Sequence, residues 1–405
     1  MIPSDTFCIL PWIHLATWPN GNAVPCCIAA AGEDFGNTRD STIAELVNGS
    51  KMNQLRLDML AGKRNSVCAN CHHGEDTVGH SSRMAQNRDF NKYIQDAPGN
   101  TNIDGSLKQF NMRYFDIRFS NLCNLKCRSC NSTFSTQWEA EDRKAGVAWA
   151  QTVPKNNNPN LLQEIFTHIP TMERAYFAGG EPLVIEEHYQ LLEEMIRQGR
   201  TDIKLIYNTN LTNLEFKNRD IIKLWSHFKE VDVSASVDHY GRRAEYMRHG
   251  TNWLQLEENI RRLREVRQIR YFSLHTVVSV FNILSLPEFY LYLMDNELYM
   301  AGDNIYSSLV LTGPEYLSVL ILPLELREQA RQRLQKLITV MSLERFRPVH
   351  IDYITRILTY LDTPRVMDEQ RELFFKETDR IDKLRGESFP DVFPELSDFY
   401  QKYHP

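Results

Sequence analysis

The chain has 405 residues, of which 42% are apolar and 24% are charged, and its formal net charge is −6. This is the composition of a globular protein with room for two or three domains, and the absence of a basic tract predicts no nucleic-acid partner. No run approaches 18 apolar residues and the first residues do not resemble a signal peptide, so we expect no membrane contact and a cytoplasmic location.

All eight cysteines lie in the first third of the chain, and they form two groups. Disulfide scaffolds are typical of small secreted domains, whereas this chain is long and carries no secretory signal. Clustered thiols in a reducing compartment are more often metal ligands, so two groups predict two metal centres. The first group occupies positions 8, 26, 27, 68 and 71, and the second occupies 123, 127 and 130.

Residues 1–110 show no alternation of strands and helices, and we expect them to form a separate domain that a metal centre ties together. Within this segment, the Asn20–Gly21 dipeptide predicts a hairpin turn. Such a turn would bring the strand ends that carry Cys8 and Cys26 close to each other.

From about residue 112, strand-like runs alternate with helical stretches, which predicts a parallel sheet with right-handed crossovers. Six strands fall short of the eight that close a full barrel. We therefore expect an α/β fold with an incomplete (β/α)6 barrel over 111–322, or an open doubly wound sheet as the alternative, and a helical extension over 323–405. The expected strands are 113–119, 174–180, 203–210, 230–238, 271–279 and 304–311, and the expected helices include 185–199, 253–266 and 285–297.

Polar residues follow the carboxyl ends of these strands, where both architectures bind their ligands. The second cysteine group follows the first strand, and Gly179, Gly180 and Glu181 follow the second. Asn208 and Asn210 end the third strand. Ser236 and Asp238 end the fourth.

The segment SNLCNLKCRSCN places three cysteines at spacings x3 and x2, with no further cysteine downstream. Structural zinc sites usually have four ligands. Three thiolates on a strand-to-helix loop suit one face of a [4Fe–4S] cubane, which leaves the fourth iron free to chelate a small ligand and pass it an electron.

This C-x3-C-x2-C loop after the first strand of a partial barrel resembles the signature of the radical S-adenosylmethionine (SAM) enzymes, and the resemblance extends over about 112–312. AGGEP (178–182) resembles the family's Gly-Gly-Glu-Pro turn, and YNTNLT (207–212) lies where the family has its TNG strand end. SVDHYGRRAEYMRHG (236–250) is similar to the Ser-x-Asp…Arg stretch of the peptide-modifying members. Ser129 departs from the pattern, since an aromatic residue commonly precedes the third cysteine.

The resemblance implies a [4Fe–4S] cluster on Cys123, Cys127 and Cys130 with SAM beside it. It implies reductive cleavage of SAM to a 5′-deoxyadenosyl radical, which abstracts hydrogen from an unactivated C–H of a peptide or a sugar-like small molecule. An external electron donor such as flavodoxin or ferredoxin is implied as well. The residues implied in SAM binding are Gly179, Gly180, Glu181, Asn208, Asn210, Ser236 and Arg248, although the asparagines also suit turns and the serine suits a helix cap.

In the first group, C-x12-G-x4-C resembles the SPASM and twitch domains of radical SAM enzymes, which implies an auxiliary [4Fe–4S] cluster. Its implied ligands are Cys8, Cys26, Cys68 and Cys71. Cys27 either replaces its neighbour as a ligand or is a buried free thiol. The order departs from the family, because such a domain usually follows the barrel.

Two alternatives remain open from the sequence. The first group could hold structural zinc, since C-x2-C is also zinc spacing and His72 and His73 adjoin the last cysteine. The whole chain could also be an iron–sulfur electron-transfer or scaffold protein without SAM chemistry. Metal analysis separates the first alternative, and formation of 5′-deoxyadenosine separates the second.

Overall fold

The computed structural model describes residues 2–30, 32–147, 158–303, 307–365 and 367–404, and it divides the chain into two compact units. The first unit comprises Met1–Leu122, Gln151–Tyr207 and Arg219–Val231, and the second comprises Cys123–Ala150, Asn208–Asn218 and Asp232–Pro405. The two units are discontinuous in sequence and differ from the three consecutive segments 1–110, 111–322 and 323–405 expected above. Those three domain boundaries stay a prediction.

Five strands of the first unit are hydrogen-bonded neighbours in the order β6, β5, β3, β1, β2. The pairs that join the first four strands are parallel, and Phe115 lies opposite both Ala175 and Leu15. The last strand forms an antiparallel hairpin with its neighbour, with Ala16 opposite Val24. The bounds are β1 His14–Thr17, β2 Ala23–Val24, β3 Tyr114–Asp116, β5 Arg174–Phe177 and β6 Lys204–Thr209.

The predicted hairpin turn at Asn20–Gly21 is confirmed. Gly21 has a φ of +85°, and its N–H donates to the carbonyl oxygen of Trp18 at 2.8 Å. A Cβ at this position would lie 2.5 Å from Asn37 Oδ1, so glycine is required here. The sequence did not indicate that β1 would also pair with β3.

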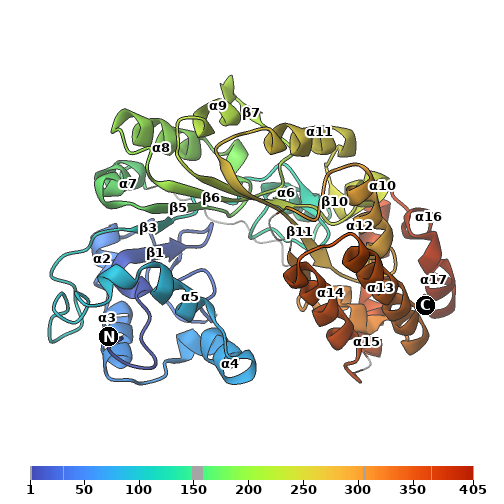
Figure 1. Cartoon of the computed structure of the whole chain (residues 1–405), viewed down its shortest axis with the longest axis horizontal. Helices are drawn as coiled ribbons and strands as arrows, with labels where there is room; N and C mark the ends of the chain where they lie inside the picture. Colours follow the sequence, from blue (N-terminus) through green and yellow to red (C-terminus); the bar gives the residue numbers. More distant parts are fainter. Residues whose placement is uncertain (1, 31, 148–157, 304–306, 366, 405) are drawn as a thin grey trace. The chain divides into compact units, whose positions relative to one another are not determined.

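Helices of the first unit pack around these strands (Figure 1). In α8, Glu186 and Glu187 occupy the first turn and Arg197 the last, which suits the helix dipole. His188 of α8 hydrogen-bonds through Nε2 to the hydroxyl of Tyr207 in β6 at 2.9 Å. The bounds are α1 Leu10–Ile13, α2 Ile43–Val47, α3 Ser50–Leu60, α4 Ala69–Val78, α5 Ser82–Asp89, α7 Leu161–His168, α8 Glu186–Arg197 and α9 Ile221–Trp225.

In the second unit, β9 (Val231–Ser236), β11 (Ile269–Val278) and β12 (Ser307–Val310) are neighbours in that order. β11 and β12 are parallel, with Thr276 opposite Ser308. Alternate residues of β9 are buried, as expected for a strand with one covered face. The helices that follow these strands in sequence are α10 (Gly241–Met247), α11 (Trp253–Arg264) and α12 (Leu286–Asp295).

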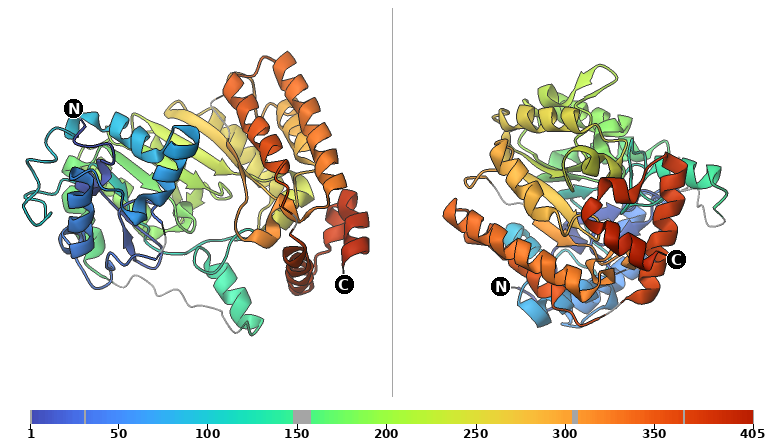
Figure 2. Two further views of the ribbon diagram at one scale, coloured as in Figure 1. Left: turned by 90° about the horizontal axis from the view of Figure 1, so that it is seen from below. Right: turned by 90° about the vertical axis from the view of Figure 1, so that its right-hand side faces the viewer.

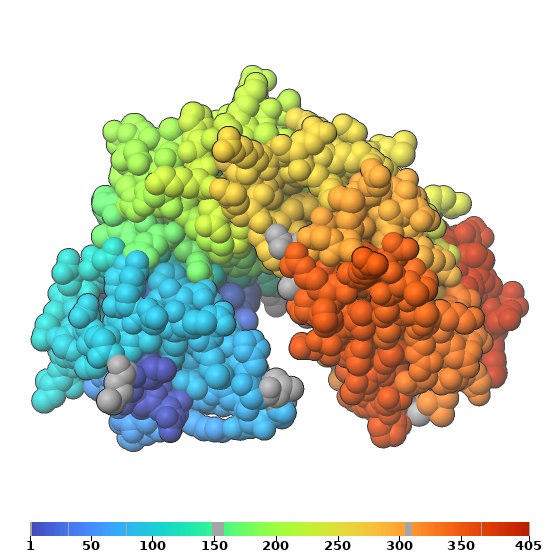
Figure 3. Space-filling model, viewed as in Figure 1, coloured from blue at the N-terminus to red at the C-terminus, as the bar shows by residue number. Residues whose placement is uncertain are grey.

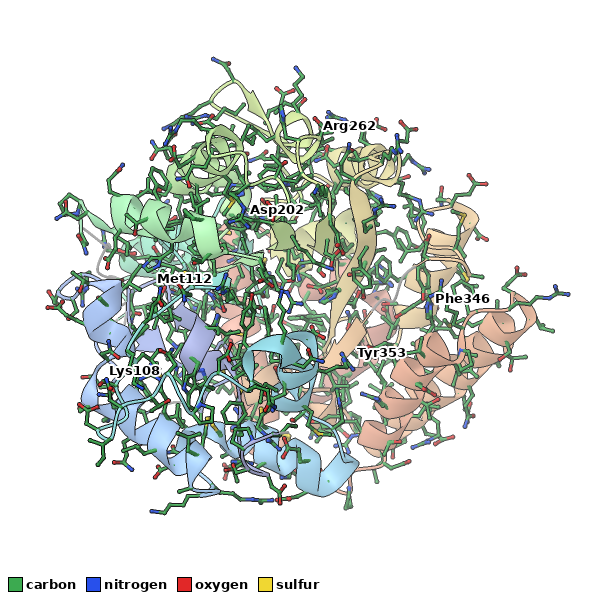
Figure 4. The ribbon with its side chains drawn as sticks, turned by 60° about the vertical axis from the view of Figure 1, so that its left-hand side comes forward. Lys108, Met112, Asp202, Arg262, Phe346 and Tyr353 are labelled. Atoms are coloured by element: carbon green, nitrogen blue, oxygen red, sulfur yellow. The ribbon has the colours of Figure 1, made fainter. Side chains whose placement is uncertain are left out.

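The C-terminal segment of this unit is helical, as predicted. The antiparallel helices α13 and α14 lie side by side in both ribbon views (Figures 1 and 2). Phe346 (Figure 4) is buried in the turn between them, with its ring 5.0 Å from that of Tyr299. In Figure 3 the orange and red atoms form a closely packed body. The bounds are α13 Leu324–Leu343, α14 Pro348–Leu361, α15 Asp368–Arg385, α16 Phe389–Val392 and α17 Ser397–Tyr403.

The six expected strands are present as β3, β5, β6, β9, β11 and β12, although residues 304–306 of the last lie outside the described residues. The expected helices at 185–199, 253–266 and 285–297 are present within one or two residues of each predicted end. Mostly parallel strands with surrounding helices confirm the predicted α/β class. Within the described ranges, no helix is long and apolar enough to cross a membrane.

The core of the first unit contains a buried carboxyl group, that of Asp116, which lacks hydrogen-bond donors among the described residues. Asp116, at the end of β3, is fully buried, and neither of its carboxylate oxygens accepts a hydrogen bond within the described part of the chain. Arg118 Nε lies 3.6 Å from Oδ1, while its guanidinium stacks over the ring of Trp18. Burial raises the pKa of Asp116 to about 7, although Arg118 and the Cys27 thiol act in the opposite direction.

We predict that Asp116→Asn makes the protein less sensitive to alkaline pH. The folded-state pKa lies above the unfolded value, so this group's stabilising contribution is complete below about pH 4 and is lost as the pH rises through 7. Urea unfolding of the two reconstituted proteins should show the variant gaining about 2–3 kcal/mol relative to wild type between pH 5 and pH 8.

The matched control is Asp202→Asn, at a surface position in the turn before β6 (Figure 4). A hydrogen bond from Arg200 lowers the pKa of Asp202, so this carboxylate stays charged over the whole range. Its variant should keep a constant stability difference from wild type. A constant difference for Asp116→Asn as well would contradict the prediction.

Candidate functional site

The loop that carries Cys123, Cys127 and Cys130 is held by its backbone. Its central strand β4 (Lys126–Cys127) pairs antiparallel with β10 (Arg248–His249), and this pairing sets Cys127 opposite Arg248. The carbonyl oxygen of Cys127 accepts hydrogen bonds from Cys130 N at 3.0 Å and from Trp138 Nε1 at 2.8 Å. Trp138 belongs to α6 (Thr136–Lys144), so the two later thiols lie in one turn between β10 and α6.

The thiols of this loop have polar donors beside them. Arg248 Nη1 lies 3.7 Å from Cys127 Sγ, and Asn210 Nδ2 lies 3.9 Å from Cys123 Sγ. Burial raises the pKa of Cys127, while the charge of Arg248 opposes that effect. Burial, together with Cys127, raises the pKa of Cys130 to about 12.

Arg248 is fixed by a carboxylate that the sequence reading did not select as a site residue. Its Nε lies 2.8 Å from Asp238 Oδ2, and Nη2 lies 3.2 Å from Oδ1. Asp238 is buried and its Oδ1 accepts the backbone N–H of Val277 at 2.8 Å. The hydrogen bond from β11 fixes the Asp238 carboxylate. That carboxylate orients the Arg248 guanidinium toward the Cys127 sulfur.

Asn210 belongs to a second network that sequence reasoning found only in part. Its Nδ2 donates to Asn124 Oδ1 at 3.0 Å, and Asn124 Nδ2 donates to Thr212 Oγ1 at 2.8 Å. Asn210 Oδ1 accepts the N–H of Thr212, which is an Asx-type turn. The turn and the contact with Cys123 therefore coexist. By contrast, Asn208 is exposed, and Ser236 is partly buried at the end of β9.

In the first unit, the turn of Gly179, Gly180 and Glu181 approaches the chain just before the cysteine loop. Glu181 N donates to Leu122 O at 2.8 Å, and a Cβ on Gly180 would lie only 2.1 Å from that oxygen. Gly179 has a φ of +123° and packs against Arg118. Both glycines are thus needed for a close backbone approach.

Glu181 is buried, and its Oε1 accepts the N–H of Leu183 at 3.1 Å. The side chain therefore caps the short helical turn Pro182–Val184.

The first cysteine group also comes together in the first unit. One mostly apolar cavity is lined by all four predicted ligands, and Arg83 reaches its wall. Arg83 is held by Glu75, with 2.6 Å between Nη2 and Oε2, and by the carbonyl of Phe7. The cysteines around this cavity are Cys8, Cys26, Cys68 and Cys71.

Cys27 does not line this cavity and instead lies near Asp116. Burial, together with the charge of the Asp116 carboxylate, raises the pKa of Cys27 to about 11. His72 is buried 3.9 Å from Glu75, and His73 is exposed. The position of the cavity therefore distinguishes Cys26, which lines it, from Cys27, which does not. The spacing of the cysteines in the sequence could not make this distinction.

The chemistry of these donors fits iron–sulfur clusters. Burial, together with the neighbouring thiolates, raises the pKa of Cys8 and of Cys68 to about 12. Thiols in such surroundings ionise only when a bound metal supplies positive charge. Over the described ranges no group of three or more Cys, His, Asp or Glu side chains is placed to hold one metal ion. The cluster assignment rests instead on the shared cavity and the donor chemistry.

Two family models match the chain. Residues 117–293 match "Radical SAM superfamily", and residues 8–72 match SPASM, described as "Iron-sulfur cluster-binding domain". No curated protein matches. The radical SAM domain implies SAM and a [4Fe–4S] cluster, and the SPASM domain implies an auxiliary iron–sulfur centre.

Comparison with solved structures finds slight likeness. The structure "Native anSMEcpe with bound AdoMet and Cp18Cys peptide" is 15% identical, with a TM-score of 0.39, and the match covers 56% of this chain and 60% of that one. Streptococcus suis SuiB bound to S-adenosylmethionine is 12% identical, with a TM-score of 0.36 and coverage of 71% and 63%. These TM-scores are too low to support an argument. On the two family matches, the chain carries a SPASM domain over residues 8–72 ahead of a radical SAM domain over residues 117–293.

Proposed function

We propose that this enzyme cleaves SAM reductively and abstracts hydrogen from an unactivated C–H of a peptide or small-molecule substrate. The observation that carries the proposal is the cysteine loop, where Arg248 and Asn210 place donors beside two of three clustered thiols. When bound, the cluster and SAM together supply a 5′-deoxyadenosyl radical, and the protein's part is to bind, orient and exclude water.

In this proposal Cys123, Cys127 and Cys130 hold the [4Fe–4S] cluster. Arg248 and Asn210 donate to the sulfurs, since hydrogen bonds and positive charge near thiolates set the potential of an iron–sulfur cluster. This effect on the cluster potential adds to the contact with SAM expected for both residues. In this proposal the buried Asp238–Arg248 ion pair keeps the guanidinium beside the cluster sulfur.

Glu181 is proposed to bind the methionyl ammonium group of SAM through its buried carboxylate, with Gly179 and Gly180 admitting the ligand close to the backbone. Asn208 and Ser236 are proposed to contact SAM from their strand ends. An external electron donor such as flavodoxin or ferredoxin would supply the electron that SAM cleavage consumes.

The auxiliary cluster is proposed to lie in the cavity lined by Cys8, Cys26, Cys68 and Cys71. Arg83 at the cavity wall would offset part of the negative charge of four thiolates. Iron–sulfur rather than zinc is supported by the match of residues 8–72 to an iron–sulfur cluster-binding domain. The alternative of an electron-transfer scaffold predicts no 5′-deoxyadenosine from SAM under strong reductant.

We predict that anaerobic reconstitution gives about two [4Fe–4S] clusters per chain, because three plus four cysteines match the two sites. Replacing Cys123, Cys127 and Cys130 together by alanine should remove about half of the iron and abolish 5′-deoxyadenosine formation. Iron analysis and product chromatography check both results. Unchanged iron in the triple variant would end the assignment of this loop as a cluster site.

Glu181→Gln should weaken SAM binding by about 1–3 kcal/mol, the range for losing a charged hydrogen bond. Glutamine keeps an oxygen that can accept the Leu183 N–H, so the turn should survive while its charge is lost. Calorimetric titration of SAM into the reconstituted protein measures the change. Glu181→Ala, which also removes the cap, should lose about 1 kcal/mol of folding stability in addition. Wild-type affinity in the glutamine variant would show that the carboxylate serves the turn alone.

The auxiliary site should distinguish two neighbouring cysteines. Cys26→Ser should lose the second cluster, whereas Cys27→Ser should keep it, because only Cys26 lines the cavity. Iron content after reconstitution gives the readout. Replacing Cys68 and Cys71 by alanine should also loosen residues 1–110 to protease, because metal binding contributes to the folding free energy of such a segment. One equivalent of zinc in the anaerobically purified protein would refute the auxiliary iron–sulfur assignment.

A further inference from the structure

The last turn of α15 and the residues just after it carry charged side chains that contact the cysteine loop. These residues are Asp382, Arg385 and Glu387. They lie outside the matched segment 117–293 and more than 240 positions from their partners, which are Arg128 in the loop and Glu141 in the helix α6 that follows it. All of these contacts lie within the second unit.

One set of contacts holds Arg128, the residue after Cys127. Its Nη2 donates to Glu387 Oε2 at 2.6 Å and to Asp382 Oδ1, and its guanidinium lies 3.6 Å from the ring centroid of Tyr246. Tyr246 also donates its hydroxyl to Asp382 at 2.9 Å. Arg128 is almost fully buried, so the carboxylates of Asp382 and Glu387 pair with it away from solvent.

A second set holds the helix α6, which follows the loop. Arg385 Nη2 donates to Glu141 Oε1 at 2.8 Å, and Glu141 also pairs with Lys126. The buried guanidinium of Arg385 stacks over Trp138 at 4.8 Å. Trp138 is the side chain that donates to the carbonyl oxygen of Cys127.

The chain turns sharply between these two sets of contacts. Gly386 has a φ of +66° and closes α15, which brings Glu387 back toward the loop and to His249 at 2.7 Å. Buried ion pairs stabilise a fold weakly, because the cost of desolvation offsets their attraction. The two sets of contacts are therefore better explained by their fixing the position of the cysteine loop than by a contribution to folding stability.

We propose that the C-terminal extension is a positioning element for the cluster loop. Asp382 and Glu387 fix Arg128, which lies between two cluster cysteines, and Arg385 fixes the helix whose tryptophan holds Cys127. This proposal rests on the proposed function, because it requires the loop to bind a cluster. Asp382 and Glu387 act on the loop through Arg128, whereas Arg385 acts through Glu141 and Trp138 and its charge also lowers the pKa of Cys127.

Release of iron from the reconstituted full-length enzyme to a ferrous chelator tests this proposal. Glu387→Gln should release about half of the iron about tenfold faster than wild type, the lower limit for losing a supporting contact around a metal ligand. Arg385→Met should do the same, while Arg385→Lys, which keeps the charge, should restore slow release. The electron paramagnetic resonance spectrum of the reduced loop cluster, and its response to SAM, should change in the two fast variants only.

The matched control is Glu395→Gln. Glu395 lies in the same extension, is as buried as Glu387, and pairs with Arg243 at 2.7 Å instead of with the loop. Its variant should release iron as wild type does. Wild-type release and spectra in Glu387→Gln and Arg385→Met would overturn the positioning proposal alone, and so would faster release of all the iron. Iron unchanged by loss of Cys123, Cys127 and Cys130 would overturn the proposed function and this proposal together.

Discussion

A buried thiol must become a thiolate before it can bind iron, and both cysteine groups are arranged around that requirement. Burial alone raises the pKa of these thiols, and each group has an arginine nearby that opposes the rise. Arg248 is held by Asp238 and Arg83 by Glu75. Each site thus combines several thiols with one cation that its own carboxylate orients, so the positive charge stays in place when no metal is bound.

Much of this arrangement was visible in the sequence because its signals are local. Strand ends followed by glycine, asparagine and cysteine predicted where polar side chains would gather, and Asn20–Gly21 predicted a hairpin that the structure contains. The two cysteine spacings predicted the two domains that the family models match. The assignment of individual ligands and SAM contacts stays a prediction, although the cavity includes Cys26 and not Cys27.

The ion pairs that sequence reasoning missed depend on tertiary packing. Asp238 lies only 10 positions from Arg248 and was visible in the Ser-x-Asp motif, but nothing in the sequence showed that the two side chains pair. Arg128 and Asp382 are 254 positions apart, and each reads alone as a surface charge. Nothing in the sequence distinguishes Asp116 from an ordinary strand residue, and only the tertiary packing shows that its carboxyl group is buried. Pairing of charges across a fold depends on tertiary packing, and no periodicity in a single sequence encodes it.

The position of the SPASM domain ahead of the radical SAM domain has a simple physical explanation within the first unit. A parallel sheet can accept a strand at its edge from either end of the chain, provided that the connection is long enough. β1 pairs with β3 and is itself paired by β2, so the hairpin of the N-terminal domain covers an edge that would otherwise expose unpaired backbone groups. The same register sets Ala16 opposite Asp116, and Cys27, just beyond that hairpin, lies near the Asp116 carboxyl. Reversing the order of the domains therefore still allows the cysteine hairpin to pack on the strand that leads to the second cysteine group.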